Sequence, residues 1–177
     1  IMRHYIYILF VLFSFRLSAQ TTVEVCMTGL CDYNLIQDAI DYFQETDELS
    51  APFIIHVKEG TYQENLIIEI SLTLMGYTEN PNTIDPTDFI IDGSSPSDPL
   101  LGSVITVRPP SGSNTNGLDP SDAALAHPQV TIKNFTITGG SGTLMENRRL
   151  ENQGSTQGKW IGSGLLAYLT IPIIENC

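Results

Sequence analysis

The feature that most constrains the fold is a group of three short β-branched segments between Phe53 and Tyr77. These segments are Phe53–Val57, Leu66–Ile70 and Leu72–Met75, separated by a Glu59-Gly60 turn and by Ser71 alone. Strands this short and this close cannot be joined by crossover helices, which take a dozen or more residues. The chain must therefore bend around itself, and we expect each segment to enter a different sheet.

Similar segments recur along the rest of the chain, at residues 89–94, 103–107, 130–140 and 170–176. A repeat of roughly 20–25 residues, with Gly, Asn or Asp at the end of each turn, is typical of a stacked solenoid. The sequence therefore predicts an all-β fold, a parallel β-helix over residues 53–177. Linked parallel strands favour the right-handed sense.

One amphipathic helix is expected before the solenoid, at residues 34–46. Its apolar residues follow the spacing of a single helix face: Leu35, Ile36, Ala39, Ile40 and Phe43. Asn34 is placed to cap the first turn, and Gln37 to complete a capping box. We expect this helix, within an N-terminal cap of residues 20–52, to cover the first coil and its unpaired strand edges.

The first 19 residues have the pattern of a secretory signal peptide. Arg3 and His4 form a basic head, an apolar run covers Tyr5 to Phe15, and Ala19 precedes the expected cleavage site. The apolar run is shorter than the roughly 20 residues that span a bilayer. A buried N-terminal strand or helix is the alternative. We expect a secreted protein without membrane insertion after cleavage, and a chain truncated at Cys177, which interrupts a coil.

The chain is strongly acidic, with a net charge of −12. Such a surface repels nucleic acids and anionic membranes, and it disfavours acidic polysaccharides unless a cation or a basic cluster intervenes. Cys26 and Cys31 lie ahead of the helix and are expected to form a disulfide in an oxidising compartment. Two thiols without further Cys or His nearby do not make a complete metal site.

The segments together resemble the N-terminal coils of the pectin lyase-like superfamily of right-handed parallel β-helix proteins. Gly60-Thr61-Tyr62-Gln63-Glu64-Asn65 is similar to the G-x-Y-x-E element of pectin methylesterases. The resemblance implies a β-helix and a carbohydrate-associated role. The residues after Gly76 match none of the catalytic motifs of the methylesterases, pectate lyases or polygalacturonases in that superfamily. We therefore assign no catalytic, cofactor-binding or metal-binding residue.

Two residues of that element still have alternative interpretations. Glu64 is either an acid in a substrate groove or, as we favour, a carboxylate that accepts backbone N–H bonds and orders the chain. Tyr62 is either a platform for a sugar ring or, as we favour, a packed aromatic side chain with a solvated hydroxyl.

Other residues are weaker candidates. Six aspartates in polar loops could contribute oxygen ligands to a structural calcium ion, although solvated loop acids are the simpler interpretation: Asp85, Asp88, Asp92, Asp98, Asp119 and Asp122. His56 is expected on the outer face of its strand. Trp160 either stacks on a sugar or covers a coil.

Three functions remain open. The first is a secreted module of a larger extracellular protein. It would associate with a polysaccharide or cell-surface glycan, and its other partner would be the remainder of its own chain. The second is the N-terminal part of a polysaccharide lyase, hydrolase or esterase whose catalytic coils lie beyond residue 177. The third is a structural, adhesin-like stalk.

Overall fold

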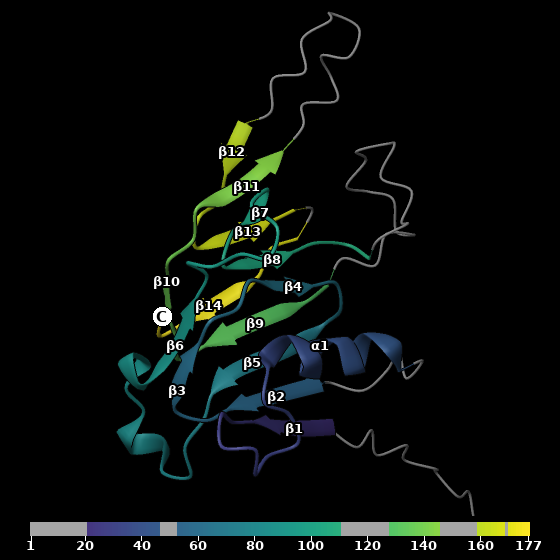
Figure 1. The fold of residues 1–177 in the computed structure, drawn as a ribbon. Helices are drawn as coiled ribbons and strands as arrows, with labels where there is room; N and C mark the ends of the chain where they lie inside the picture. Colours follow the sequence, from purple (N-terminus) through teal and green to yellow (C-terminus); the bar gives the residue numbers. More distant parts are fainter. Residues whose placement is uncertain (1–20, 47–52, 111–127, 146–158, 169) are drawn as a thin grey trace, which may run out of the picture.

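The computed structural model describes residues 21–46, 53–110, 128–145, 159–168 and 170–177. Short strands lie across the molecule as stacked rungs, with the helix beside the first of them (Figure 1). The longest sheet contains five parallel strands in the order β1 (Thr21–Val25), β2 (Phe53–Val57), β5 (Leu72–Gly76), β9 (Val130–Lys133) and β14 (Ile173–Glu175). Strands far apart in sequence are thus neighbours in space.

Two further parallel sheets complete the coils. One contains β3 (Gly60–Tyr62), β6 (Phe89–Asp92) and β10 (Thr136–Thr138), and the other β4 (Leu66–Ile68), β8 (Ile105–Val107) and β13 (Leu165–Ala167). The chain visits the three sheets in turn through β2, β3 and β4, and then returns to the first sheet with β5. This winding confirms the predicted parallel β-helix.

The predicted assignment of each early segment to a different sheet is wrong. Phe53 pairs with Leu72, so the first and third segments are successive rungs of one sheet. The missing sheet is supplied by β3, where a turn was predicted at Glu59-Gly60. A three-residue strand that begins with glycine has too few apolar side chains to be recognised from a hydrophobic pattern.

The core is built from columns of aliphatic side chains, one from each rung. Ile55, Leu74 and Ile132 lie in register on neighbouring strands, and each is fully buried. Neighbouring parallel strands lie about 4.8 Å apart, so such a column excludes water continuously along the axis. The third residues of β4 and β8, Ile68 and Val107, form an equivalent buried pair.

An antiparallel sheet was not predicted. It contains β7 (Leu101–Gly102), β11 (Gly142–Met145) and β12 (Lys159–Ile161). Strands β11 and β12 lie at the two ends of the polar stretch between Ser141 and Lys159. Two short 3-10 helices, η1 (Pro81–Thr83) and η2 (Pro86–Asp88), lie between β5 and β6. Strand β12 is followed by β13, which resumes the parallel stack.

The predicted helix is present as α1 (Ile36–Glu45). It buries Ile36, Ala39, Ile40 and Phe43 as the apolar spacing predicts, whereas Leu35 lies at the N-cap position and is exposed. The predicted capping box is wrong, because the N-cap residue makes no side-chain hydrogen bond to the helix. The two free N–H groups at the helix start are bound from another part of the chain, as described below.

The cap closes all three parallel sheets at their first rungs. Strand β1 pairs along β2, and the loop after β1 lies against β3, where a Cβ added at Gly60 would be 2.9 Å from Met27 Sδ. On α1, Gln37 hydrogen-bonds the backbone of Ile67 in β4, and Gln44 accepts the N–H of Glu69 just after β4. This arrangement confirms that the helix covers unpaired strand edges.

Some predictions fall on residues that the structure does not describe. The signal peptide lies within residues 1–20, and Asp119 and Asp122 lie within residues 111–127. These expectations remain predictions from the sequence.

Candidate functional site

Tyr62 is a packed core residue. Its side chain is 3% exposed, and its hydroxyl donates a hydrogen bond to Lys58 C=O at 3.0 Å. Burial, with a smaller contribution from the charge of Glu64, raises the pKa of Tyr62 to about 12. The favoured interpretation as a packed aromatic is confirmed, although the hydroxyl binds the backbone and was predicted to be solvated. Its ring is not available to a sugar.

Glu64 binds the start of the helix. Its Oε1 accepts Ile36 N–H and its Oε2 accepts Gln37 N–H, each at 2.9 Å. Burial raises the pKa of Glu64, while these two hydrogen bonds act in the opposite direction. The predicted role as an acceptor of backbone N–H groups is confirmed, with the helix as the donor. A negative carboxylate at a helix N-terminus also interacts favourably with the helix dipole.

Asn65, the last residue of this element, also has a structural role. Its side-chain amide donates to Ser103 C=O at 3.0 Å and to Gly93 C=O at 3.3 Å. It therefore fastens the start of β4 to the next coil. Tyr62, Glu64 and Asn65 bind parts of the fold that lie 4 to 38 residues away in sequence. In this protein the Gly60–Asn65 element therefore has a structural role: its side chains hold neighbouring parts of the fold together.

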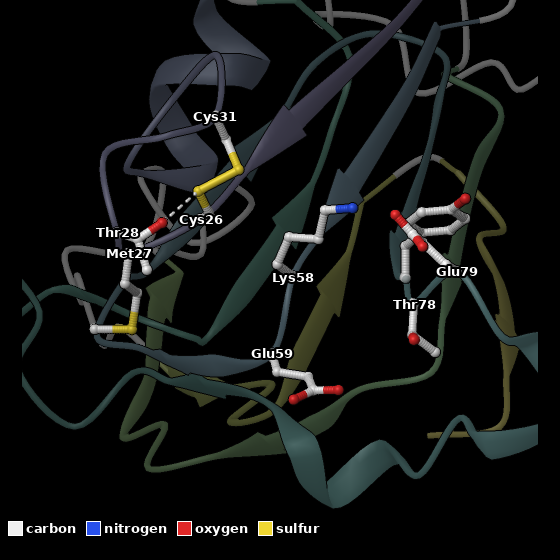
Figure 2. A pocket seen from close by; sticks show the side chains of 9 residues that line it. Cys26, Met27, Thr28, Cys31, Lys58, Glu59, Thr78 and Glu79 are labelled. Atoms are coloured by element: carbon white, nitrogen blue, oxygen red, sulfur yellow. Dashed lines mark hydrogen bonds between the residues drawn. A yellow bond between two sulfur atoms is a disulfide. The ribbon is translucent and has the colours of Figure 1, made fainter.

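A pocket of about 430 Å³ opens beside the first coil. Figure 2 shows the disulfide loop with Met27 and Thr28 on one side, Thr78 and Glu79 on the other, and Lys58 and Glu59 between them. The lining residues come from three segments: Cys26, Met27, Thr28 and Cys31; Lys58 and Glu59; and Tyr77, Thr78 and Glu79. They meet because the turns after β2 and β5 are stacked in register.

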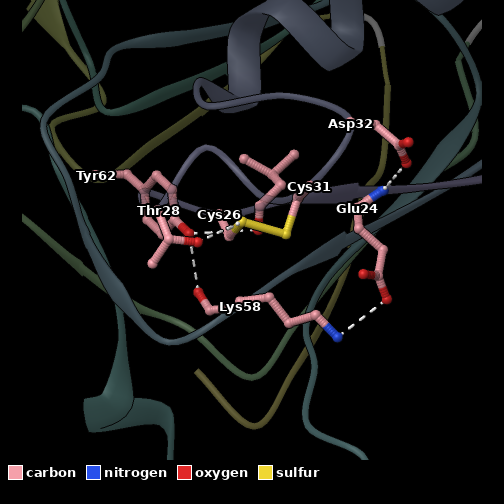
Figure 3. The surroundings of a disulfide bond; sticks show 8 residues. Glu24, Cys26, Thr28, Cys31, Asp32, Lys58 and Tyr62 are labelled. Atoms are coloured by element: carbon pink, nitrogen blue, oxygen red, sulfur yellow. Dashed lines mark hydrogen bonds and ion pairs between the residues drawn. A yellow bond between two sulfur atoms is a disulfide. The ribbon is translucent and has the colours of Figure 1, made fainter.

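A disulfide between Cys26 and Cys31 fixes one wall of this pocket, as Figure 3 shows. The expected disulfide is thereby confirmed. Thr28 Oγ1 lies 3.2 Å from Cys26 Sγ, and Asp32 Oδ2 accepts Glu24 N–H at 2.8 Å. Two side-chain contacts and a covalent link therefore hold the loop in one conformation. This rigidity makes the wall a preformed surface.

The centre of the pocket is occupied by a lysine that already has partners. Lys58 Nζ lies 3.0 Å from Glu24 Oε1 and 4.7 Å from the centre of the Tyr77 ring. Tyr77 also stacks on His56, with ring centres 3.9 Å apart and an interplanar angle of 7°. The four side chains form one contiguous group on the outer surface of the longest sheet, where His56 was predicted.

The charges around His56 act on its pKa in opposite directions. Burial lowers the pKa of His56; the charge of Lys58 lowers it further, and that of Glu24 opposes the change. His56 is therefore largely neutral above its ordinary pKa of 6.5. It stacks face to face on Tyr77, and no hydrogen bond to another side chain was found within the described part of the chain. The ring is therefore held in place by its stack on Tyr77.

Three of the six aspartates considered as calcium ligands, Asp85, Asp92 and Asp98, accept hydrogen bonds in local turns. Asp85 Oδ1 accepts the N–H and the hydroxyl of Thr87 at 2.9 and 2.7 Å, which lowers the pKa of Asp85. Asp92 and Asp98 each accept the N–H two residues further on, at 3.0 and 2.8 Å. Asp88 ends η2. Within the described ranges, no group of three or more His, Cys, Asp or Glu side chains could hold a metal ion.

Trp160 lies on β12 with 52% of its side chain exposed. It pairs with Leu144, whose N–H donates to Leu100 C=O at 2.8 Å. The three side chains share one face of the antiparallel sheet, because directly opposed residues point to the same side. Sequence reasoning singled out Trp160 and did not anticipate this row or the pocket, since both depend on register between distant strands.

Within the described residues, no helix is long and apolar enough to cross a membrane. No protein-family model matches the chain, and no curated protein matches it in sequence.

Proposed function

We propose that this chain is a secreted, non-catalytic β-helix module of a larger extracellular protein, and that it associates with a polysaccharide or a cell-surface glycan. The observation that carries the proposal is the position of Glu64. Glu64, the carboxylate for which an acid in a substrate groove was the alternative interpretation, binds the helix start through both oxygens. A side chain that caps a helix in this way is withdrawn from catalysis.

The outer surface supports an association role. Stacked parallel coils make extended surfaces, and this one carries the preformed pocket and the exposed Trp160. Aromatic and apolar surfaces beside polar groups are what small-ligand sites usually contain. The net charge of −12 disfavours anionic glycans. We therefore expect a neutral or basic glycan as the partner.

Secretion is supported by the covalent chemistry of the cap. Disulfides form and persist in oxidising compartments and are rare in the cytosol, and Cys26 is bonded to Cys31. To test this, residues 1–40 are fused to a reporter enzyme that is active only after export. Export of this fusion, and its loss when Tyr5–Phe15 are deleted, supports the proposal. Equal activity of both fusions contradicts it.

Glycan association is tested with the purified full chain and a panel of insoluble and arrayed glycans. Retention on at least one neutral or basic glycan, without release of soluble sugar, supports the proposal. Release of soluble sugar would favour the polysaccharide-degrading enzyme, and an absence of retention across the panel would favour the adhesin-like stalk. Either result contradicts the proposal.

A further inference from the structure

We propose that the pocket between the disulfide loop and residues 77–79 binds a sugar unit that carries a free amino group, and that it discriminates against uronic acids. The inference rests on the proposed glycan association and names the ligand class. The first observation is the size of the pocket. A volume of about 430 Å³ lies within the range of roughly 300–1,000 Å³ that small-molecule sites occupy.

The walls of the pocket offer apolar surface to the C–H groups of a sugar ring. Met27 is 60% exposed and stands next to the Cys26–Cys31 disulfide on one side. A thioether is polarizable and adapts to irregular shapes. The Tyr77 ring forms part of the lining; His56 stacks on it and Lys58 lies over it, so it is held in place, and Met27 provides the apolar surface for the sugar. A ligand therefore meets surfaces that lose little conformational freedom on binding.

The polar groups of the pocket are mostly hydrogen-bond acceptors. Glu59 and Glu79 are exposed carboxylates in its lining, and Thr28 and Thr78 add hydroxyl groups. Ionised carboxylates only accept hydrogen bonds, whereas sugar hydroxyls and an ammonium group donate them. Figure 2 shows Glu79 beside Thr78 on one side and Glu59 below Lys58 in the middle, so both carboxylates border the same pocket.

The charge balance selects between sugar classes. Lys58, the one basic residue in the lining, is paired with Glu24 at 3.0 Å and lies over Tyr77. Neither Glu59 nor Glu79 has an ion-pair partner within the described ranges. The pocket therefore presents uncompensated negative charge. An ammonium group there gains charge-assisted hydrogen bonds, and a uronate is repelled.

The test uses the full chain and three oligosaccharides of equal length, measured by calorimetry: a fully deacetylated glucosamine oligomer, its N-acetylated counterpart and an oligogalacturonate. The deacetylated oligomer is expected to bind at least fivefold more tightly than the acetylated one, with the oligogalacturonate weakest. Added salt should reduce this preference, because exposed charges are screened within about 8–10 Å. Equal binding of the deacetylated and acetylated oligomers, or tighter binding of the oligogalacturonate, overturns the inference.

The paired variant Glu59→Gln/Glu79→Gln locates the site. It retains the side-chain size and removes both charges, and it should weaken binding of the deacetylated oligomer about five- to tenfold, since an exposed ion pair contributes roughly 0.2–1 kcal/mol. The double variant Glu45→Gln/Asp88→Asn, which removes two exposed charges outside the pocket lining, is the matched control and should bind as the unaltered chain does. Unchanged affinity in the paired variant overturns the pocket assignment and leaves the proposed function intact. No binding of any glycan contradicts both.

Discussion

The side-chain amide of Gln37 pairs with the backbone of Ile67 as a neighbouring strand would. Gln37 Oε1 accepts Ile67 N–H at 2.9 Å, and Gln37 Nε2 donates to Ile67 C=O at 3.2 Å. Ile67 is the middle residue of β4, which pairs with β8 on its other edge. Open strand edges are templates for pairing with other chains. A helix side chain here satisfies the edge without adding a strand.

Replacing Gln37 with Ala should therefore destabilise the fold by about 1–2 kcal/mol, since each lost hydrogen bond contributes roughly 0.5–1.5 kcal/mol. Urea unfolding measures the loss, and hydrogen exchange at the Ile67 amide should accelerate. Gln63→Ala is the control, because Gln63 is an exposed glutamine next to β3. Equal stability of the two variants, with unchanged exchange at Ile67, would contradict the edge-capping role.

The apolar columns and the helix stripe could be predicted because burial leaves a period in the sequence. Ile36, Ile40 and Phe43 recur at helical spacing and are buried. The partners of Gln37 could not be predicted in this way. A glutamine three residues after an asparagine has the same local pattern whether it closes a capping box or reaches a strand 30 residues further on. Only the tertiary fold distinguishes these outcomes.

The pocket could not be predicted from the sequence for a related reason. Lys58 and Tyr77 come together because β2 and β5 are adjacent rungs, and that register depends on β3 completing the coil between them. Because a turn was predicted in place of β3, the stacking of the turns after β2 and β5 could not be predicted. The structural role of Glu64 was predicted in kind, because a carboxylate close to a turn commonly accepts backbone N–H groups. Its partners, 27 and 28 residues earlier, were not.

Replacing Glu64 with Ala should cost about 1–2 kcal/mol of stability, the usual effect of removing an N-terminal helix cap. The N–H groups of Ile36 and Gln37 would lose their acceptors. Thermal and urea unfolding measure the loss, and hydrogen exchange at these two amides should accelerate while exchange in the far coils does not. A variant as stable as the original chain would show that another group caps the helix.

The pH dependence of Glu64 has a definite sign. Burial raises its pKa in the folded protein above the ordinary value of 4.5, so the folded state holds this proton more tightly. Its contribution to stability is full below pH 4.5 and is lost as pH rises through the raised pKa. Glu64→Gln cannot titrate, so the stability of the variant relative to the original chain should increase across that window. A constant difference would contradict the raised pKa.

Aspartate substitutions in two strands should have unequal effects. Ile68 is fully buried in the core, whereas Ile137 is only partly buried against the core. Ile68→Asp places an unpaired charge among aliphatic side chains and should cost several kcal/mol, enough to abolish cooperative unfolding. Ile137→Asp should retain a cooperative transition at a lower temperature. Circular dichroism melting curves compare them, and a reversed order would contradict the assigned inward positions.

His56 should titrate below its ordinary pKa of 6.5, because burial on the strand and the charge of Lys58 disfavour its protonated form. The unfolded chain then takes up the proton first, so the stability contributed by neutral His56 is present above pH 6.5 and is lost as pH falls through the lowered pKa. An NMR titration of the ring protons measures the value directly. A pKa at or above 6.5 would contradict the burial argument.

Two variants separate the charges that act on His56. Lys58→Met removes a nearby positive charge and should raise the pKa of His56, whereas Glu24→Gln removes a negative charge and should lower it. Lys58 and Glu24 are bound to each other at 3.0 Å, so each substitution leaves the partner's charge as the nearer of the two that act on His56. Shifts of the same sign in both variants would show that the ion pair does not act on the His56–Tyr77 stack.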